Sequence, residues 1–188
     1  MKRIKTPWDF LNSVFAKYKP DTENLLNECF QFDWENTKIE KLMKNDETII
    51  LECKNYLRKN YKLIRDAYKF FSGMEPQGRL PCIGATTFGN MISQIPDLID
   101  GVNLKSADVD LSFVAANSIR ANYPNYPDRQ LIRFNLLEAV VRICLEKYFN
   151  KKLVTTRIEA LKISFETYFQ PAWEQFDCHE IRKERFWN

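Results

Sequence analysis

The chain has 188 residues, which suits one domain or two small lobes that share a core. Its 28 Lys and Arg against 25 Asp and Glu give a near-neutral balance that lends no support to a nucleic-acid or membrane-surface role. No run of about 18 apolar residues predicts a membrane span, and five widely spaced cysteines indicate free, mostly buried thiols in a reducing compartment.

Helix-period patterns dominate the sequence, so we predict an all-α protein. Residues 1–45 are expected to form an N-terminal helical extension. One helix in it should end at Pro20, and a second should begin at Asp21 or Thr22. The connector that follows contains Trp34, which we expect to be an anchor in the core.

The strongest early helix is predicted from about Asp46 to Phe71, with Gly73 ending it. Its apolar stripe has spacings of four and three: Leu57, Tyr61, Ile64, Tyr68 and Phe71. A short helix from Phe88 to Ile95 should follow.

A further helix is predicted to be capped by Ser106, and Asp108 in its first turn should compensate the helix dipole. A long, very apolar helix, which we expect to be buried against several elements, runs from Phe134 to Tyr148. Its one charged line has i, i+4, i+8 spacing: Glu138, Arg142 and Glu146. We interpret that line as a solvated stripe whose pairs contribute about 0.2–0.5 kcal/mol each.

Residues 151–188 are expected to form a C-terminal helix and tail. The helix should cover 151–170 and end at Pro171. Its predicted apolar face consists of Leu153, Ile158, Leu161, Phe165 and Phe169.

A pattern of helix, turn with one central β-former, and helix occurs twice, around Ile83 and around Leu131. This resembles an EF-hand pair, in which two loops pair through a short β-bridge at the eighth loop position. The resemblance implies a degenerate pair over 46–150, with Cys82-Ile83 and Leu131-Ile132 forming the bridge. The fold class expected is therefore all-α, with this pair, its β-bridge and additional helices at both ends.

Calcium needs six to eight oxygens, with carboxylates at loop positions one, three and five and a bidentate Glu at twelve. At those positions the first loop has Pro76, Gly78, Leu80 and Thr87, and the second has Pro124, Tyr126, Asp128 and Asn135. One carboxylate cannot hold the ion, so we predict that neither loop binds metal and that the protein uses no cofactor.

Two stretches, "DRQLIRFNLLEAVVRICLEKYF" and "FETYFQPAWEQFDCHEIRKERFW", resemble degenerate EF-hand modules in ciliary and flagellar proteins of protists. The resemblance implies a non-enzymatic structural or adaptor protein of the ciliary or flagellar cytoskeleton. Such a protein would lie in the cytoplasm at the axoneme and bind proteins, such as tubulin or axonemal subunits, without calcium. In this chain Asn135 stands where an acidic residue is expected.

No motif predicts catalysis, since His179 beside Cys178 has no visible partner residues and no zinc-spaced set, phosphate loop or nucleophile elbow is present. A calcium-responsive regulator, an enzyme and a helical nucleic-acid-binding module remain as alternatives.

Aromatic and basic side chains are the candidate partner-binding residues, because such side chains dominate interface hot spots. They are Tyr123 and Tyr126 on a proline-stiffened turn, and Arg182, Lys183, Phe186 and Trp187 in the tail. The tail is either a strap that ties down the chain end or an anchor into a partner.

Overall fold

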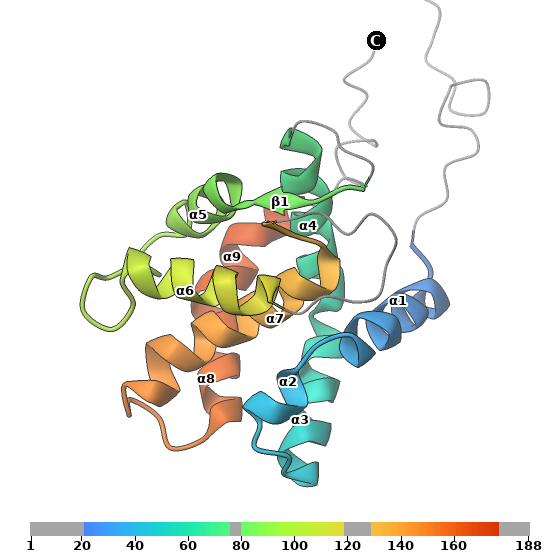
Figure 1. The fold of residues 1–188 in the computed structure, drawn as a ribbon. Helices are drawn as coiled ribbons and strands as arrows, with labels where there is room; N and C mark the ends of the chain where they lie inside the picture. The colour runs from blue at the N-terminus through green and yellow to red at the C-terminus, as the bar shows by residue number, and fades with distance from the viewer. Residues whose placement is uncertain (1–20, 76–79, 119–128, 177–188) are drawn as a thin grey trace, which may run out of the picture.

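A computed structural model of the chain describes residues 21–75, 80–118 and 129–176. These residues fold mainly into helices, with one short two-stranded antiparallel sheet (Figure 1). The all-α prediction is therefore confirmed. The helix predicted before Pro20 lies outside the described residues. Within them, no helix has the length and apolar character needed to cross a bilayer.

The described part of the N-terminal extension, residues 21–45, packs on the rest of the protein. Helix α1 (Glu23–Glu35) begins where predicted, because the Thr22 hydroxyl accepts a hydrogen bond from the backbone N–H of Leu25. Its inner side chains are Leu26, Phe30 and Trp34, all at most 4% exposed. The expectation that Trp34 anchors the core is confirmed.

Residues 46–71 do not form one continuous helix, as predicted, but two. After the short α2 (Ile39–Leu42), α3 (Glu47–Lys59) ends at Asn60, and α4 (Tyr61–Met74) starts directly after it. The Asn60 side chain donates to the Tyr56 carbonyl, an example of the local bonding by which Asn competes with helical hydrogen bonds.

The apolar stripe predicted across this region is buried on both sides of the break. Gly73 does not end the helix, because α4 continues through it to Met74.

Strand β1 (Ile83–Gly84) leads into α5 (Ala85–Ser93), and a connector leads to α6 (Ser106–Asn117). Ser106 is the first helical residue and not the cap. The cap position belongs to Lys105, whose backbone N–H donates to Asp108 Oδ2 at 2.9 Å. Asp108 therefore stabilises the helix start, as predicted, and does so through a direct hydrogen bond.

Strand β2 (Gln130–Leu131) is followed by α7 (Arg133–Cys144), which passes into a π-helical segment, η2 (Leu145–Asn150). Helix α7 contacts α1, α2, α4, α6 and α8. Contacts on so many sides explain why its sequence is apolar almost all round, and the prediction of burial against several elements is confirmed.

The C-terminal helix differs from its prediction at both ends. Helix α8 (Arg157–Ser164) begins only after Thr156, and Leu153 lies outside it with 53% of its surface exposed. Helical structure then continues through η3 (Phe165–Phe169, a π-helix), α9 (Gln170–Trp173) and η4 (Glu174–Phe176, a 3₁₀-helix).

Pro171 does not stop this helix. A proline lacks an N–H and its ring crowds the carbonyl four residues earlier, which normally breaks an α-helix. Here the wider π-helical turn of η3 precedes the proline and changes the hydrogen-bond spacing at that point.

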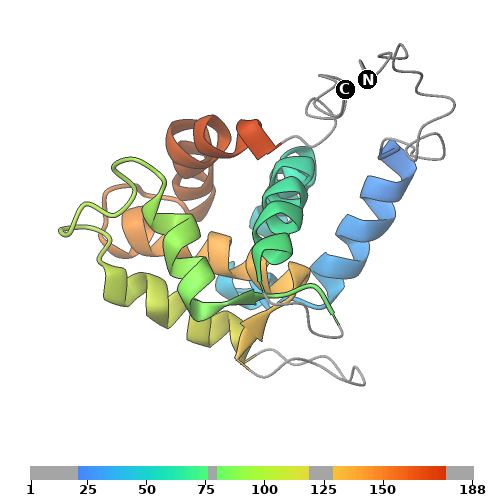
Figure 2. The same ribbon diagram turned by 90° about the horizontal axis from the view of Figure 1, so that it is seen from above.

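One apolar cluster joins the N-terminal, central and C-terminal parts of the described chain. Buried side chains from α1, from α3 to α7 and from α8 to α9 belong to it. Viewed from above, α4 lies between α1 on one side and α5 and α9 on the other (Figure 2). Cys53, Cys82 and Cys144 are buried free thiols and Cys29 is partly buried, which fits the prediction from the sequence; Cys178 lies outside the described residues. Burial raises the pKa of Cys53 and Cys144 to about 12.

Candidate functional site: the paired loops and their closures

The two loops meet in the short sheet. Strands β1 and β2 are antiparallel, with Ile83 opposite Leu131 and Gly84 opposite Gln130. Both apolar partners are fully buried. The bridge predicted between these two β-formers is present, but it extends toward Gly84 and Gln130 and not toward Cys82 and Ile132. The Cys82 thiol instead donates to the Gln130 side-chain oxygen.

The first loop is closed by hydrogen bonds between α4 and the chain entering β1. The Tyr68 hydroxyl donates to the Pro81 carbonyl, and Glu75 Oε1 accepts from the backbone N–H of Gly84 at 2.7 Å. A Cβ at Gly84 would meet Glu75 Oε1 at 3.0 Å, so a residue without a side chain allows this close approach. Glu75 thus ties the end of α4 to the strand directly.

The second loop is closed in the same manner by two asparagines. Asn135 is fully buried, and its amide donates to the Ala116 carbonyl at 2.9 Å while its Oδ1 accepts from the Ile132 N–H. Asn117 donates to the Gln130 carbonyl at 2.7 Å. The side chain at loop position twelve therefore links α6 to the start of α7.

The described parts of both loops offer few metal ligands. Of the eight ligand positions, the structure describes Leu80, Thr87 and Asn135. Asn135 is committed to backbone partners, and Leu80 is apolar. No group of three or more His, Cys, Asp or Glu side chains that could hold an ion occurs within 21–75, 80–118 and 129–176.

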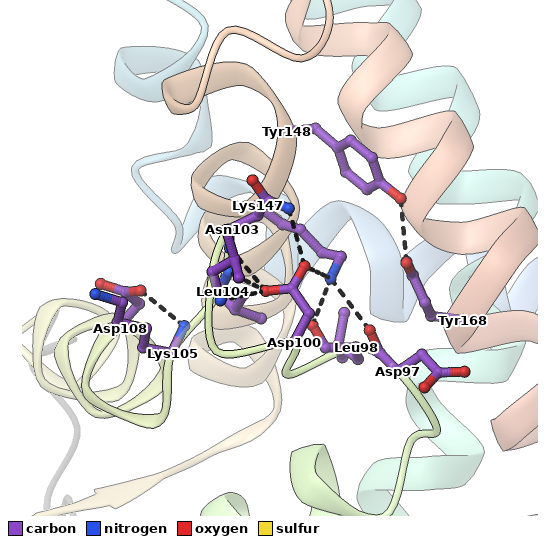
Figure 3. A network of polar contacts seen from close by, with 11 residues as sticks. Asp97, Leu98, Asp100, Asn103, Leu104, Lys105, Asp108, Lys147, Tyr148 and Tyr168 are labelled. Carbon is purple, nitrogen blue, oxygen red and sulfur yellow. Dashed lines mark hydrogen bonds and ion pairs between the residues drawn. The ribbon is translucent and has the colours of Figure 1, made fainter.

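The connector between α5 and α6 is held by a buried lysine (Figure 3). Lys147 in η2 is 3% exposed, and its ammonium donates to the carbonyls of Leu98 at 2.7 Å and Asp97 at 3.2 Å and to Asp100 Oδ2 at 3.0 Å. It also lies 5.0 Å from the centre of the Tyr168 ring. The three N–H groups of the ammonium thus have three oxygen partners.

Asp100 shapes the same connector into a tight turn. Its Oδ1 accepts from the backbone N–H groups of Val102, Asn103 and Leu104, at 2.7–3.0 Å. The bond from Leu104 and the contact with Lys147 hold the pKa of this carboxyl well below its usual range. Together, Asp100 and Lys147 fix the path of the connector from α5 to α6.

Sequence reasoning missed this pair. The run "DGVN" at 100–103 is a turn signal in which an Asp can accept from backbone N–H groups two to four residues on. Lys147 and Glu146 stand between Leu145 and the aromatic pair Tyr148 and Phe149, an apolar context in which a charged side chain is buried only with a partner. Neither signal identifies the other residue.

A buried ion pair joins α1 to α7. Asp33 is 1% exposed and accepts two hydrogen bonds from the Arg133 guanidinium, at 2.6 and 2.9 Å, and a third from the Tyr61 hydroxyl. Burial raises the pKa of Asp33 by more than Arg133 lowers it. A bidentate contact, in which one guanidinium donates two hydrogen bonds to one carboxylate, is the stronger geometry for such an ion pair.

The charged line on α7 is not a solvated stripe, which corrects our interpretation from the sequence. Glu138 is fully buried; its Oε1 accepts from Arg142 at 2.7 and 2.9 Å and its Oε2 accepts from the backbone N–H of Lys38 at 2.7 Å. Glu146, which lies in η2, has a 28% exposed side chain and is paired with Lys151. The surface prediction was wrong because the segment around Lys38 packs against α7 where Glu138 lies.

The apolar sides of α4 and α5 are covered by the C-terminal helices. Trp173 is 1% exposed, and Phe176 stacks on Phe70 with ring centres 4.5 Å apart. Between Phe71, Met91 and Trp173 only about 20 Å³ of space remains. This apolar surface is therefore filled by the chain itself.

None of the six candidate partner-binding residues lies in the described part of the chain. Tyr123 and Tyr126, and Arg182, Lys183, Phe186 and Trp187, lie outside the described residues, as do Cys178 and His179.

Comparisons of the chain with models of known protein families, with curated proteins and with solved structures give no match.

Proposed function

We propose that the described helices contain a degenerate EF-hand pair, with α4–β1–α5 and α6–β2–α7 as its two units. The observation that carries this proposal is the antiparallel pairing of Ile83 with Leu131. These residues stand at the eighth position of the two loops in the sequence pattern, which is where EF-hand loops pair.

We also propose that the pair works without calcium. Glu75 and Asn135 already join each loop to its neighbouring helix, a task that a bound ion performs in a calcium-binding loop. Lys147 supplies a fixed positive charge to the oxygens of the connector. A lobe held by packing and side-chain hydrogen bonds keeps the same shape at any calcium concentration.

The function we propose is that of a non-enzymatic structural or adaptor protein that binds other proteins in the ciliary or flagellar cytoskeleton. Support comes from the resemblance of the α7 and C-terminal segments to modules of that class. A rigid, constitutive lobe also suits a structural component better than a switch. Tubulin or axonemal subunits are the partners this assignment favours.

A calcium titration tests the metal-free part of the proposal. We expect no saturable heat when calcium is titrated into the full chain by isothermal calorimetry, and no change in tryptophan fluorescence. Binding with a dissociation constant of about 0.1–10 μM, the range of sensor EF-hands, would instead indicate a calcium-responsive regulator.

Cell fractionation tests the location independently. In ciliated or flagellated cells that make the protein, detergent extraction should leave it with the axonemes. Full release into the soluble fraction would contradict a structural role there, whatever the calcium titration shows.

A further inference from the structure

The last described segment of the chain, residues 170–176, packs on α4 and α5 through very few side chains. We call this segment, which comprises α9 and η4, the C-terminal latch. Trp173 is its one fully buried residue, at 1% exposed, while Ala172 and Phe176 are partly buried and the other four residues are exposed. Its attachment therefore depends mainly on one indole ring.

Within the part of the chain that the structure describes, no hydrogen bond or ion pair joins the latch to α4 or α5. Its side-chain hydrogen bonds stay within the latch, from Gln170 to Glu174 and from Gln175 to the Ala172 carbonyl. The Trp173 N–H is buried but has no hydrogen-bond acceptor among the described residues. Helix α1, by contrast, is joined to α7 by a buried ion pair. Apolar contact alone therefore holds the latch, and because such contact is non-directional, other apolar groups can replace it.

Open space flanks the latch on both sides. A groove of about 230 Å³ lies between the latch and α4, with Leu63 and Asp66 on the α4 side. A second groove, of about 610 Å³, lies between the latch and the chain that leaves α5, at Ile95 and Pro96. The packing is tight beneath Trp173, where about 20 Å³ of space remains. The latch thus meets the rest of the protein along one narrow contact and has room to move away from it.

The backbone at the start of the latch has the features of a hinge. It follows the π-helix η3, and a break from α-helical hydrogen bonding within a helix often marks a functional site or a hinge. Pro171 has no N–H to donate to the preceding turn. Phe165 and Phe169 are fully buried, so η3 itself is anchored in the core. Movement about this point would therefore be confined to residues 170–176.

We propose that the C-terminal latch swings about this hinge and uncovers the apolar surface beneath it, where Phe71 and Met91 lie. The uncovered surface takes up an apolar helix of a partner protein. The chain's own occupant indicates the chemistry of that helix, which is two aromatic side chains three positions apart, as in Trp173 and Phe176. The latch and the partner helix compete for one surface, so binding shifts the latch to its open state. Opening leaves the loop closures in place, and the inference does not depend on the proposed cytoskeletal function.

Hydrogen exchange of the full wild-type chain, followed by NMR, tests the opening. We expect the backbone amides of the latch and the Trp173 indole N–H to share one opening equilibrium and to exchange at least about 100-fold faster than the amides of α7. Exchange of the latch only through global unfolding would overturn the proposal. Exchange rates that rise steadily from Trp173 to Phe176, with no shared step, would show simple fraying of the helix end and would overturn it as well.

A peptide with the sequence of residues 165–176, FETYFQPAWEQF, tests what the surface accepts. It should bind the full-chain Trp173→Ala variant with a dissociation constant on the order of 100 μM and shift the methyl resonance of Met91. The wild type should bind the peptide at least about 10-fold more weakly, because its own latch occupies the surface. Leu153→Ala is the matched control and should behave as the wild type does, because Leu153 is 53% exposed and lies outside the latch.

Circular dichroism melts establish whether Trp173→Ala is folded. If it is not, Phe176→Ala takes its place, because this change removes a partly buried ring of the latch and should also strengthen peptide binding relative to the wild type. A folded latch variant that binds the peptide no better than Leu153→Ala does would overturn the proposal. A peptide that binds equally well when its own Trp is replaced by Ala would overturn it too, because the surface would then not select the aromatic side chain.

Discussion

Replacing Lys147 with Met is the sharpest test of how the connector between α5 and α6 is held. Methionine fills much of the same volume and keeps the apolar stem, but it removes the ammonium. The carbonyls of Leu98 and Asp97 then lose their shared donor, and Asp100 loses its buried cationic partner.

The magnitude follows from the three lost hydrogen bonds. Bonds to a charged group contribute about 1.5–3 kcal/mol each and do not add fully. Asp100 keeps its backbone donors and is 29% exposed, so its carboxylate remains solvated and the full cost of an orphaned buried charge does not apply. We expect the free energy of unfolding to fall by about 2–4 kcal/mol, out of a typical total of about 5–15.

Urea denaturation followed by circular dichroism measures this loss. With a denaturant slope of about 2 kcal/mol/M, a loss of about 3 kcal/mol moves the midpoint down by about 1.5 M. Lys151→Met is the matched control, because Lys151 follows η2 directly but its pair with Glu146 is solvent-accessible. It should cost less than about 1 kcal/mol.

The reasoning would be refuted by a Lys147→Met midpoint within about 0.3 M of the wild type, which at that slope corresponds to a loss of only about 0.6 kcal/mol. Equal losses in the Lys147 and Lys151 variants would refute it too, because they would show that burial and oxygen partners contribute nothing beyond the loss of a charge.

Three further predictions concern the other buried polar contacts. Glu138→Ala should lower the free energy of unfolding by about 2–4 kcal/mol, because it orphans the Lys38 N–H and frees Arg142, while Glu146→Ala should cost less than about 1 kcal/mol; urea midpoints of the two variants compare them. Asn135→Ala should cost about 1–3 kcal/mol by breaking the α6–α7 link, and an unchanged midpoint would show that another contact closes the loop. Asp100 has a folded-state pKa below its unfolded value of about 3.9, so its contribution is present above that pH and is lost as the pH falls below it; Asp100→Asn should therefore flatten the stability profile between about pH 5 and pH 2.

Periodicity in the sequence was enough to identify the faces of the main helices. The stripe from Leu57 to Phe71 is buried, although Asn60 divides its helix into two. The pairing of Ile83 with Leu131 was expected from the resemblance of the repeated helix–turn–helix pattern to paired EF-hand loops. These features depend on residues close together in the chain or on one repeated local pattern.

Local rules for helix ends were less reliable. Gly73 and Pro171 both lie within helical structure that was expected to stop there. In each case the preference of one residue is weaker than the packing of the whole helix, and at Pro171 the preceding π-helical turn changes the hydrogen-bond spacing.

The sequence by itself determined that the protein is helical and which apolar stripes supply most of its core, while the meeting point of its two short strands was expected from the resemblance to paired EF-hand loops. Only the tertiary structure decided which charged residues are buried. Glu138 accepts from a backbone group 100 residues away, and Lys147 donates to a carbonyl 49 residues away. A periodic pattern shows which face of a helix a side chain lies on, but it carries no information about what lies opposite that face.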